Sequence, residues 1–295
     1  MGATTLDGEA VATRIKDDLR QRVGVLAAAG VTPGLGTLLV GDDAPSANYV
    51  SMKHRDSEAL GIASFDVRLP ATAAESDVLE VVERFNADPA VDAYLMQYPF
   101  PPGLDYEALL LRMDPAKDVD GLHPVSLGKL VMGSDGPLPC TPHGIVELLH
   151  AYDVELTGAH VVIIGRGLTI GRPLANLLSL KRPGLNAAVT VVHTGVARDT
   201  MAALTRQADV LVAAAGSPGL VTADMVKPGA AVIAAGVTYE GRRVISDVAD
   251  DVADVAGWLS PRIGGVGPMT RAMLLSNCVA AAERRVSSNG AGDHE

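Results

Sequence analysis

The sequence predicts an α/β protein built from two lobes. Apolar segments of strand length alternate with helical segments twice along the 295 residues, and one long stretch rich in Pro and Gly, residues 97–142, separates the two series. Alternating strands and helices favour parallel sheets with right-handed crossovers. A chain of this length is also long enough to form two hydrophobic cores. We therefore expect an N-terminal α/β lobe over residues 1–144 and a C-terminal Rossmann-like lobe over residues 145–268.

The expected helices and strands follow from the period of the hydrophobic residues and from the Gly and Pro residues that end each segment. Helices are predicted over 8–29, 46–60, 73–86, 145–153, 171–181, 199–206 and 269–286. Strands are predicted over 35–41, 63–70, 91–96, 160–165, 188–193, 209–215 and 230–236. The polar residues 287–295 read as a flexible tail.

Composition excludes several classes of protein. The net charge of −11 disfavours a nucleic-acid partner, because the phosphate backbone would be repelled. Cys140 and Cys278 are far apart and have no CxxC partner, which indicates reduced thiols in a cytoplasmic protein and no metal site. The N-terminus lacks the apolar core of a signal peptide, and no apolar run reaches the ~20 residues of a membrane span.

A glycine turn follows the predicted strand 160–165. Gly165, Gly167 and Gly171 have GxGxxxG spacing, one residue longer than the usual dinucleotide fingerprint, and a helix comes next. Glycines there permit a tight turn and close approach of an anion to the helix N-terminus. The context favours a nucleotide site, although glycines that merely pack are the alternative.

The end of the following strand bears on which nucleotide is bound. NAD enzymes carry an acidic residue there for the ribose 2′-hydroxyl, whereas this strand ends in His193, Thr194 and Gly195. Arg166 in the glycine turn and Arg198 supply cations instead. A missing acid with an available cation predicts NADP, unless Arg166 is only a solvated turn residue.

One face of the predicted helix 46–60 carries Ser46, Tyr49 and Lys53, at spacings of three and four residues. A lysine on a buried face needs a partner or a route to solvent. Spacing alone favours the ordinary interpretation, in which the side chain snorkels to water.

Three further polar residues follow the expected strand 91–96 or lie in the long loop after it. Gln97 follows strand 91–96, at the carboxyl edge where ligands of parallel sheets collect; a loop amide that caps backbone is an equal alternative. Asp118 and Asp120 lie in the long loop, where aspartates often form Asx turns.

Ordered motifs over roughly residues 5–285 resemble the FolD family of bifunctional methylenetetrahydrofolate dehydrogenase/cyclohydrolases. They are SANYVSMKHRDSEALGI (46–62), QYPFP (97–101), DPAKDVDGLHP (114–124), PCTPHGIVELL (139–149), GRGLTIGRP (165–173) and GGVGPMTRAML (264–274). The resemblance implies NADP-dependent oxidation of methylenetetrahydrofolate to methenyltetrahydrofolate, then hydrolysis to 10-formyltetrahydrofolate. It also implies a place in one-carbon metabolism and purine biosynthesis, a homodimer, and a C-terminal helix that returns to the first lobe.

The resemblance also implies site residues. The catalytic set is Tyr49, Lys53, Gln97 and Asp120. Substrate binding would further involve Ser46, Pro99, Gly265, Val266, Gly267 and Pro268. Cofactor binding would involve Gly165, Arg166, Gly167, Ile170, Thr194, Arg198, Ala215, Gly216, Val237 and Thr270.

Elementary chemistry agrees with these roles. A carboxylate such as Asp120 can accept hydrogen bonds from the pterin amino and ring N–H groups, and Tyr49 offers an aromatic face. Lys53 is the candidate acid/base: a free lysine has a pKa of about 10.4, and desolvation would lower it toward about 7–8. Gln97 could hold the ammonium in place.

The chain departs from the family pattern at Gly167, Ala234, Ile263 and Ser126, mostly in the cofactor lobe. These departures put the dehydrogenase rate in doubt more than folate binding. An enzyme with one of the two activities, or a non-catalytic binding protein, remains an alternative.

Overall fold

A computed structural model describes residues 2–241 and 243–290, which form two compact units. The first, here called the three-stranded unit, comprises residues 14–129, 136–138 and 271–290. The second, called the six-stranded unit, comprises residues 2–13, 130–135 and 139–270. Both are α/β and both sheets are parallel, which confirms the predicted fold class.

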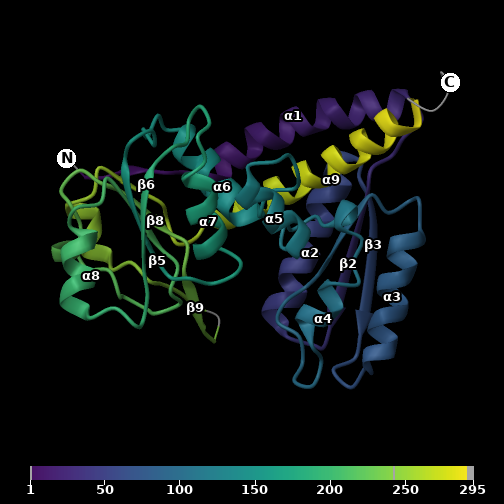
Figure 1. Cartoon of the computed structure of the whole chain (residues 1–295), viewed down its shortest axis with the longest axis horizontal. Coiled ribbons are helices and arrows are strands. Elements are labelled where there is room, and N and C mark those ends of the chain that lie inside the picture. Colours follow the sequence, from purple (N-terminus) through teal and green to yellow (C-terminus); the bar gives the residue numbers. More distant parts are fainter. Residues whose placement is uncertain (1, 242, 291–295) are drawn as a thin grey trace. The chain divides into compact units, whose positions relative to one another are not determined.

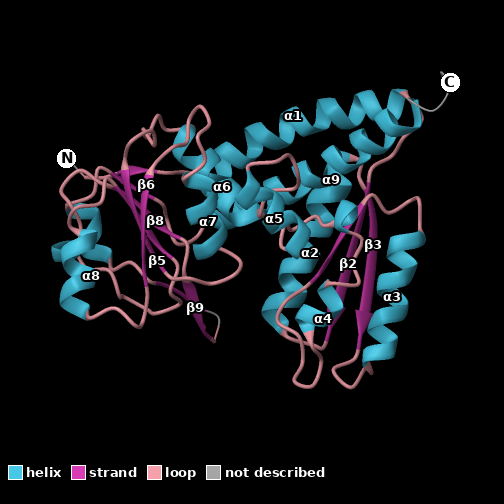
Figure 2. Cartoon of the chain, viewed as in Figure 1, coloured by secondary structure: helices cyan, strands magenta, loops and turns pink. Residues whose placement is uncertain are grey.

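The three-stranded unit has the strand order β3-β2-β4. Its strands are β2 (Gly34–Val40), β3 (Ala63–Leu69) and β4 (Ala93–Met96), connected by helices α2 (Ala44–Leu60) and α3 (Glu75–Ala87). Because the chain steps from β2 to β3 in one direction and back past β2 to β4 in the other, right-handed crossovers place α2 and α3 on opposite faces of the sheet, as Figure 2 shows.

The core of this unit forms where α3 packs on the sheet. All residues of β2 are buried, and the Phe85 ring of α3 lies 5.2 Å from the Tyr94 ring of β4. Gly36 allows this contact, since a Cβ there would lie 2.8 Å from the Tyr94 Cβ. A glycine in the central strand therefore admits two aromatic rings.

The stretch 97–142 holds more helix than the sequence predicts. It contains α4 (Tyr106–Leu110), the 3₁₀ turn η1 (Pro115–Lys117), α5 (Pro124–Met132) and the first turn of α6 (Cys140–His150). The predicted helix 145–153 corresponds to α6, and its predicted start at 145 is wrong. Pro142 lies in the first turn of α6, where a missing N–H costs no intrahelical hydrogen bond.

The six-stranded sheet has the order β1-β11-β8-β7-β5-β6. Its strands are β1 (Thr4–Thr5), β5 (His160–Ile164), β6 (Ala188–Val192), β7 (Val210–Ala213), β8 (Ala231–Ala234) and β11 (Trp258–Leu259). This unit also contains α7 (Gly171–Leu178), α8 (Arg198–Thr205), the turns η2 (Ala223–Met225) and η3 (Asp250–Asp254), and the hairpin β9 (Val237–Glu240) with β10 (Arg243–Ser246), seen in part in Figure 1.

The N-terminus does not follow the expected lobe boundary. Strand β1 pairs in parallel with β11, which draws residues 2–13 into the six-stranded unit although residues 1–144 were expected to form the first lobe. Each of these strands is only two residues long, too short to give a periodic signal.

Helices α1 (Gly8–Ala28) and α9 (Val266–Gly290) contribute residues to both units. From Arg271 onward α9 belongs to the three-stranded unit, where Arg285 Nε donates to the Asp92 carboxylate at 2.6 Å. This confirms the predicted return of the C-terminal helix. The helix continues to Gly290, four residues beyond its predicted end at 286, and residues 291–295 of the predicted tail lie outside the described residues.

A charge cluster joins three helices of this unit and carries a testable prediction. The Asp56 carboxylate of α2 is held by Lys16 Nζ and Arg271 Nε, each at 2.8 Å. Burial raises the pKa of Asp56, but the hydrogen bonds and charges of these cations outweigh it and leave the pKa below its usual value. The carboxylate therefore stabilises the fold above pH ~4, and this contribution is lost as pH falls through the lowered folded-state pKa.

We expect Asp56→Asn to lower the free energy of unfolding by about 1–2 kcal/mol at neutral pH, with a smaller difference below pH ~4. Urea unfolding at several pH values measures this. Asp17→Asn is the control, because the Asp17–Arg20 pair is exposed and should contribute less than about 1 kcal/mol. Equal losses for the two variants, or a pH-independent difference, would contradict the assignment.

Candidate functional site

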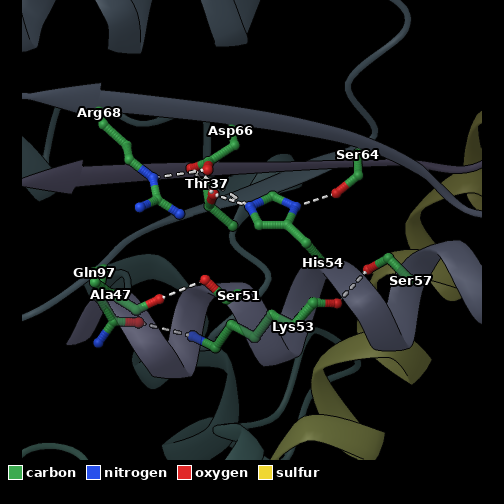
Figure 3. A network of polar contacts seen from close by, with 10 residues as sticks. All are labelled: Thr37, Ala47, Ser51, Lys53, His54, Ser57, Ser64, Asp66, Arg68 and Gln97. Carbon is green, nitrogen blue, oxygen red and sulfur yellow. Dashed lines mark hydrogen bonds and ion pairs between the residues drawn. The ribbon is translucent and has the colours of Figure 1, made fainter. Parts of the chain in front are cut away.

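Lys53 is buried on α2 and partnered within its own unit. Its side chain is 3% exposed, and its Nζ donates to the Gln97 Oε1 at 3.0 Å and lies 4.7 Å from the centroid of the Tyr49 ring. Figure 3 shows the side chain reaching along the helix toward Gln97. The snorkelling interpretation is therefore wrong: the ammonium is directed at a polar group at the end of β4.

Gln97 lies at the carboxyl edge of the sheet, and its side chain also binds backbone. Its backbone N–H donates to the Leu38 carbonyl at 2.8 Å, which continues the β2–β4 ladder and fixes its place at the carboxyl edge of the sheet. Its side-chain N–H donates to the Tyr98 carbonyl at 2.8 Å. Because one end of the amide caps backbone, the other end presents its oxygen to Lys53 in a fixed orientation.

A polar network on another side of α2 fixes the helix to the sheet. His54 contacts Thr37 Oγ1 of β2 at 2.8 Å through Nε2 and Ser64 Oγ of β3 through Nδ1, and Thr37 in turn donates to Asp66 at 3.2 Å (Figure 3). Arg68 pairs with the same Asp66 carboxylate at 2.9 Å. The residue next to Lys53 thus anchors the helix, which leaves little freedom for the Lys53 backbone.

The start of α2 and the loop after β4 place two more of the predicted residues. Ser46 is buried in the first turn, where its backbone N–H donates at 2.9 Å to the carboxylate of Asp43, the residue that caps the helix. Pro99 is exposed two residues after Gln97 and follows a cis peptide bond from Tyr98.

The two loop aspartates differ in environment. The Asp118 carboxylate is buried and accepts the N–H groups of Gly121 at 3.0 Å and His123 at 2.8 Å, so Asp118 is the Asx-turn residue that spacing suggested. Burial, chiefly, raises its pKa. Asp120 is half-buried and lies inside the turn that Asp118 closes.

An aromatic group beside Asp120 was not predicted as part of the site. Burial first, and then the charge of Asp120, raises the pKa of Tyr106. The Tyr106 ring lies 5.3 Å from the rings of Tyr98 and Phe100. The Gln97 side chain donates to the backbone carbonyl of Tyr98, so this ring cluster belongs to the same loop that follows β4. The motif QYPFP marked the first two rings, but Tyr106 had no distinguishing pattern.

A cavity of about 370 Å³ lies at the other end of β4 and includes Asp92, Asp114, Lys117 and Arg285 in its lining. Its charges serve the fold: Arg285 pairs with Asp92, and Lys117 Nζ donates to backbone carbonyls at the end of α3. This cavity is at the amino edge of the sheet and is separate from the Lys53 cluster.

The predicted glycine turn of the six-stranded unit has the form that a dinucleotide requires. Gly165 follows β5 with φ +124°, and a Cβ there would lie 2.2 Å from the Ala214 carbonyl oxygen. Gly171 begins α7, where a Cβ would lie 2.2 Å from the Gly165 oxygen. Gly167 has open space. Two glycines are thus sterically obligatory, and the backbone beside the helix N-terminus remains open to an anion.

The order of strands brings the remaining cofactor candidates to the same edge. β5 lies between β6 and β7, so the carboxyl ends of these parallel strands are neighbours, and the order in which strands are added to the sheet reverses at β5. Thr194 follows β6, and Ala215 and Gly216 follow β7. Arg166 and Arg198 are exposed near the first two strand ends, so their guanidinium groups are available to a phosphate.

Asp247 is a structural residue that the sequence did not reveal. Its buried carboxylate accepts the N–H groups of Ala215 at 2.7 Å, Gly216 at 2.9 Å and Ser217 at 2.6 Å. Gly236 makes room for it, since a Cβ there would lie 1.9 Å from an Asp247 oxygen. The turn after β7 therefore depends on an acid that follows the unpredicted hairpin.

The other predicted residues of this unit lie near α9 and β9. Gly265 precedes α9, and a Cβ there would lie 2.3 Å from the Pro261 oxygen; Val266 begins the helix. Thr270 donates to Thr141 Oγ1 at 3.1 Å. Among the other residues predicted to bind cofactor or substrate, Ile170 is half-buried and Pro268 is buried. Three more are exposed: Gly167, Val237 and Gly267.

The departures from the family pattern are accommodated locally. Ala234 is buried in β8, and its N–H donates to Ser260 Oγ at 2.8 Å. Ile263 is exposed, and Arg262 beside it faces solvent with Asp250 3.8 Å away. Ser126 is buried close to Asp118. Within residues 2–241 and 243–290, no helix has the length and apolar character needed to cross a membrane.

Comparison with known proteins gives matches over nearly the whole chain. The family model "Tetrahydrofolate dehydrogenase/cyclohydrolase, catalytic domain" matches residues 6–120, and "Tetrahydrofolate dehydrogenase/cyclohydrolase, NAD(P)-binding domain" matches residues 139–286. A curated relative from Syntrophotalea carbinolica, "Bifunctional protein FolD", is 53% identical over 290 residues, which is 98% of this chain and 99% of the relative.

Two solved structures are similar to this chain over nearly its whole length. The FolD methylenetetrahydrofolate dehydrogenase/cyclohydrolase of Campylobacter jejuni is 37% identical with a TM-score of 0.91, covering 96% of this chain and 99% of its own. The Trypanosoma brucei enzyme, solved with NADP cofactor and inhibitor, is also 37% identical with a TM-score of 0.91, covering 97% and 99%.

Proposed function

The chain belongs to the tetrahydrofolate dehydrogenase/cyclohydrolase family, and we propose that its folate chemistry takes place at Tyr49, Lys53, Gln97 and Asp120. It is an NADP-dependent enzyme with both activities: oxidation of 5,10-methylenetetrahydrofolate to 5,10-methenyltetrahydrofolate, and hydrolysis to 10-formyltetrahydrofolate. The observation that carries the site assignment is the buried Lys53 ammonium held against Gln97 at the carboxyl edge of the sheet.

Asp120 recognises the pterin. Its half-buried carboxylate can accept two hydrogen bonds from adjacent amino and ring N–H groups, and that geometry discriminates strongly because unpaired donors would be costly. Tyr49 offers a ring face beside the substrate, and Ser46 and Pro99 border the same region.

Lys53 moves the protons of the hydrolytic step. Water adds to the methenyl carbon, loses a proton, and the C–N bond to the pterin nitrogen then breaks as that nitrogen takes up a proton. In its neutral form the Lys53 amine can accept the first proton, and as the ammonium so formed it can donate the second. Gln97 and Tyr49 hold Lys53 Nζ in place while it does so, because one accepts its hydrogen bond and the other lies 4.7 Å from it.

The dehydrogenase step needs orientation more than acid–base catalysis. Bound NADP⁺ supplies the hydride acceptor. The Gly165–Gly171 turn and the N-terminus of α7 fit its pyrophosphate, because the glycines leave the backbone N–H groups accessible. We further assign Ile170, Thr194, Ala215, Gly216, Val237 and Thr270 to the cofactor, and Gly265, Val266, Gly267 and Pro268 to the substrate beside the nicotinamide.

Arg166 distinguishes NADP from NAD in this proposal. It is exposed at the turn, and no acidic residue follows β6 within 193–195. We expect Arg166→Gln to raise the KM for NADP⁺ about tenfold, the loss of one charge-assisted contact, while the KM for NAD⁺ changes little. Steady-state kinetics with both cofactors measures this. Arg262→Gln is the control, since its side chain faces Asp250; an equal effect on both cofactors in Arg166→Gln would argue against a 2′-phosphate contact.

We also propose that the enzyme is a cytoplasmic homodimer that supplies one-carbon units for purine biosynthesis and has neither nucleic-acid nor membrane partners. Its net charge of −11 supports the absence of a nucleic-acid partner. Light scattering of the purified protein tests the dimer.

An absorbance assay of the purified protein tests the function. With methylenetetrahydrofolate and NADP⁺ we expect NADPH to form without lasting accumulation of the methenyl compound, because the second activity removes it. NADPH with persistent methenyl signal would identify a dehydrogenase only, hydrolysis of added methenyl compound without NADPH formation a cyclohydrolase only, and neither signal a binding protein.

A further inference from the structure

The chain segment that carries Asp120 is attached to the sheet through its neighbour Val119. The Val119 N–H donates to the Tyr94 carbonyl of β4 at 3.3 Å, and Asp118 forms a parallel bridge with Tyr94. The Val119 side chain is fully buried. The segment thus behaves as a short extension of the sheet, and Asp120 follows immediately after its last anchored residue.

A single side chain of α9 holds the other side of this peptide. Asn277 Nδ2 donates to the Val119 carbonyl at 2.9 Å and to the Leu138 carbonyl at 2.9 Å. The side chain is only 9% exposed, so both contacts are shielded from water. An amide nitrogen has two N–H groups, and here they bridge two separate loops of the three-stranded unit.

The peptide plane explains why this contact concerns Asp120. The carbonyl of Val119, the N–H of Asp120 and the Cα of Asp120 lie in one rigid plane. A hydrogen bond from Asn277 to the Val119 oxygen therefore holds the Asp120 N–Cα bond and the Cα position in place, and rotation about that one bond is what remains to set the direction of the Asp120 side chain. On the other side, the Asp118 carboxylate closes the turn through Gly121 and His123.

We propose that Asn277 is a positioning residue for folate binding, which acts through the Val119 peptide on the carboxylate of Asp120. The proposal rests on the pterin-binding function proposed for Asp120. Asn277 touches neither substrate nor cofactor in this role; it sets the direction in which Asp120 meets its ligand, and it serves both reactions because both use the same bound folate.

Kinetics of Asn277→Ala tests the proposal. We expect the KM for the folate substrate to rise about five- to thirty-fold in the dehydrogenase and in the cyclohydrolase reaction alike. The KM for NADP⁺ should stay within twofold, because its residues lie in the other unit. In the Asp120→Ala background, Asn277→Ala should raise the folate KM no further, since the group it positions has been removed.

Glu283→Gln is the matched control, because it removes another tether of α9, the ion pair with Arg22 at 2.7 Å, without touching Val119. It should lower the melting temperature but leave the folate KM unchanged. Where Asn277→Ala does not fold, Asn277→Ser serves in its place: its shorter side chain has a single donor and cannot bridge both carbonyls, so the same rise in the folate KM is expected at a smaller size.

Two failures are distinguishable. If Asp120→Ala leaves the folate KM unchanged, the proposed function of Asp120 is wrong. If Asp120→Ala raises it while Asn277→Ala or Asn277→Ser does not, or if the two changes add fully in the double variant, the positioning proposal is overturned and Asn277 only stabilises the fold.

Discussion

Replacing Lys53 with methionine should reduce hydrolysis of methenyltetrahydrofolate by about 10²–10⁴-fold and leave the protein folded. Methionine has a similar length, tolerates burial, and cannot accept or donate the proton. Lys53 is 3% exposed and its Nζ donates to Gln97, so methionine fills the same buried space without the proton-transfer group. Stopped-flow decay of the methenyl absorbance, corrected for the uncatalysed rate, measures the effect. Lys53→Ala should lose the activity equally.

Lys16→Met is the control for this prediction. Lys16 is another partly buried lysine of the same unit, and its ammonium pairs with Asp56 at 2.8 Å. The variant should lose stability but keep a hydrolysis rate within a few-fold of the parent. A Lys53→Met protein that hydrolyses the substrate at the parent rate would remove Lys53 from the catalytic set.

The second large effect is expected at the glycine turn. Gly165→Ala places a Cβ 2.2 Å from the Ala214 oxygen in a backbone conformation, φ +124°, that other residues rarely adopt. The strain and clash together exceed about 3 kcal/mol, and the turn can relieve them only by leaving the conformation that fits the pyrophosphate, so the KM for NADP⁺ should rise about 100-fold or more. Hydrolysis of added methenyl compound should persist, since Lys53 and Gln97 lie in the three-stranded unit.

Gly167→Ser is the matched control within the same turn. A Cβ at Gly167 meets nothing within 4 Å, and its backbone is not in the left-handed region. We expect this variant to fold and to bind NADP⁺ as well as the parent or better, because serine restores a hydroxyl near the phosphates. Titration calorimetry with NADP⁺ compares the two variants; similar affinities for both would contradict the steric account of the turn.

Much of the site was predictable because its chemistry lies on regular elements. The spacing of Tyr49 and Lys53 on a helix brought them to one face, and Gln97 was placed by the end of a buried strand. Spacing alone favoured a solvated lysine, and only the resemblance to a family argued otherwise. The structure decides it, because burial and the contact with Gln97 are properties of the tertiary fold.

Other features were not predictable because their causes are non-local. Strands β1 and β11 have two residues each and exist through pairing with each other and with β8, which places the N-terminus in the six-stranded unit. Asp247 binds a turn 30 residues earlier in the chain, and Asn277 bridges two loops more than 130 residues earlier. Such contacts leave no periodic signal in the sequence.

A structure of the enzyme with NADP⁺ and a folate analogue tests the central claim most directly. We expect the pterin amino and ring N–H groups to donate to the Asp120 carboxylate, with Lys53 Nζ and Gln97 beside the carbon that carries the one-carbon unit and the Tyr49 ring against the substrate. A pterin bound away from Asp120, or a one-carbon position out of reach of Lys53, would contradict it.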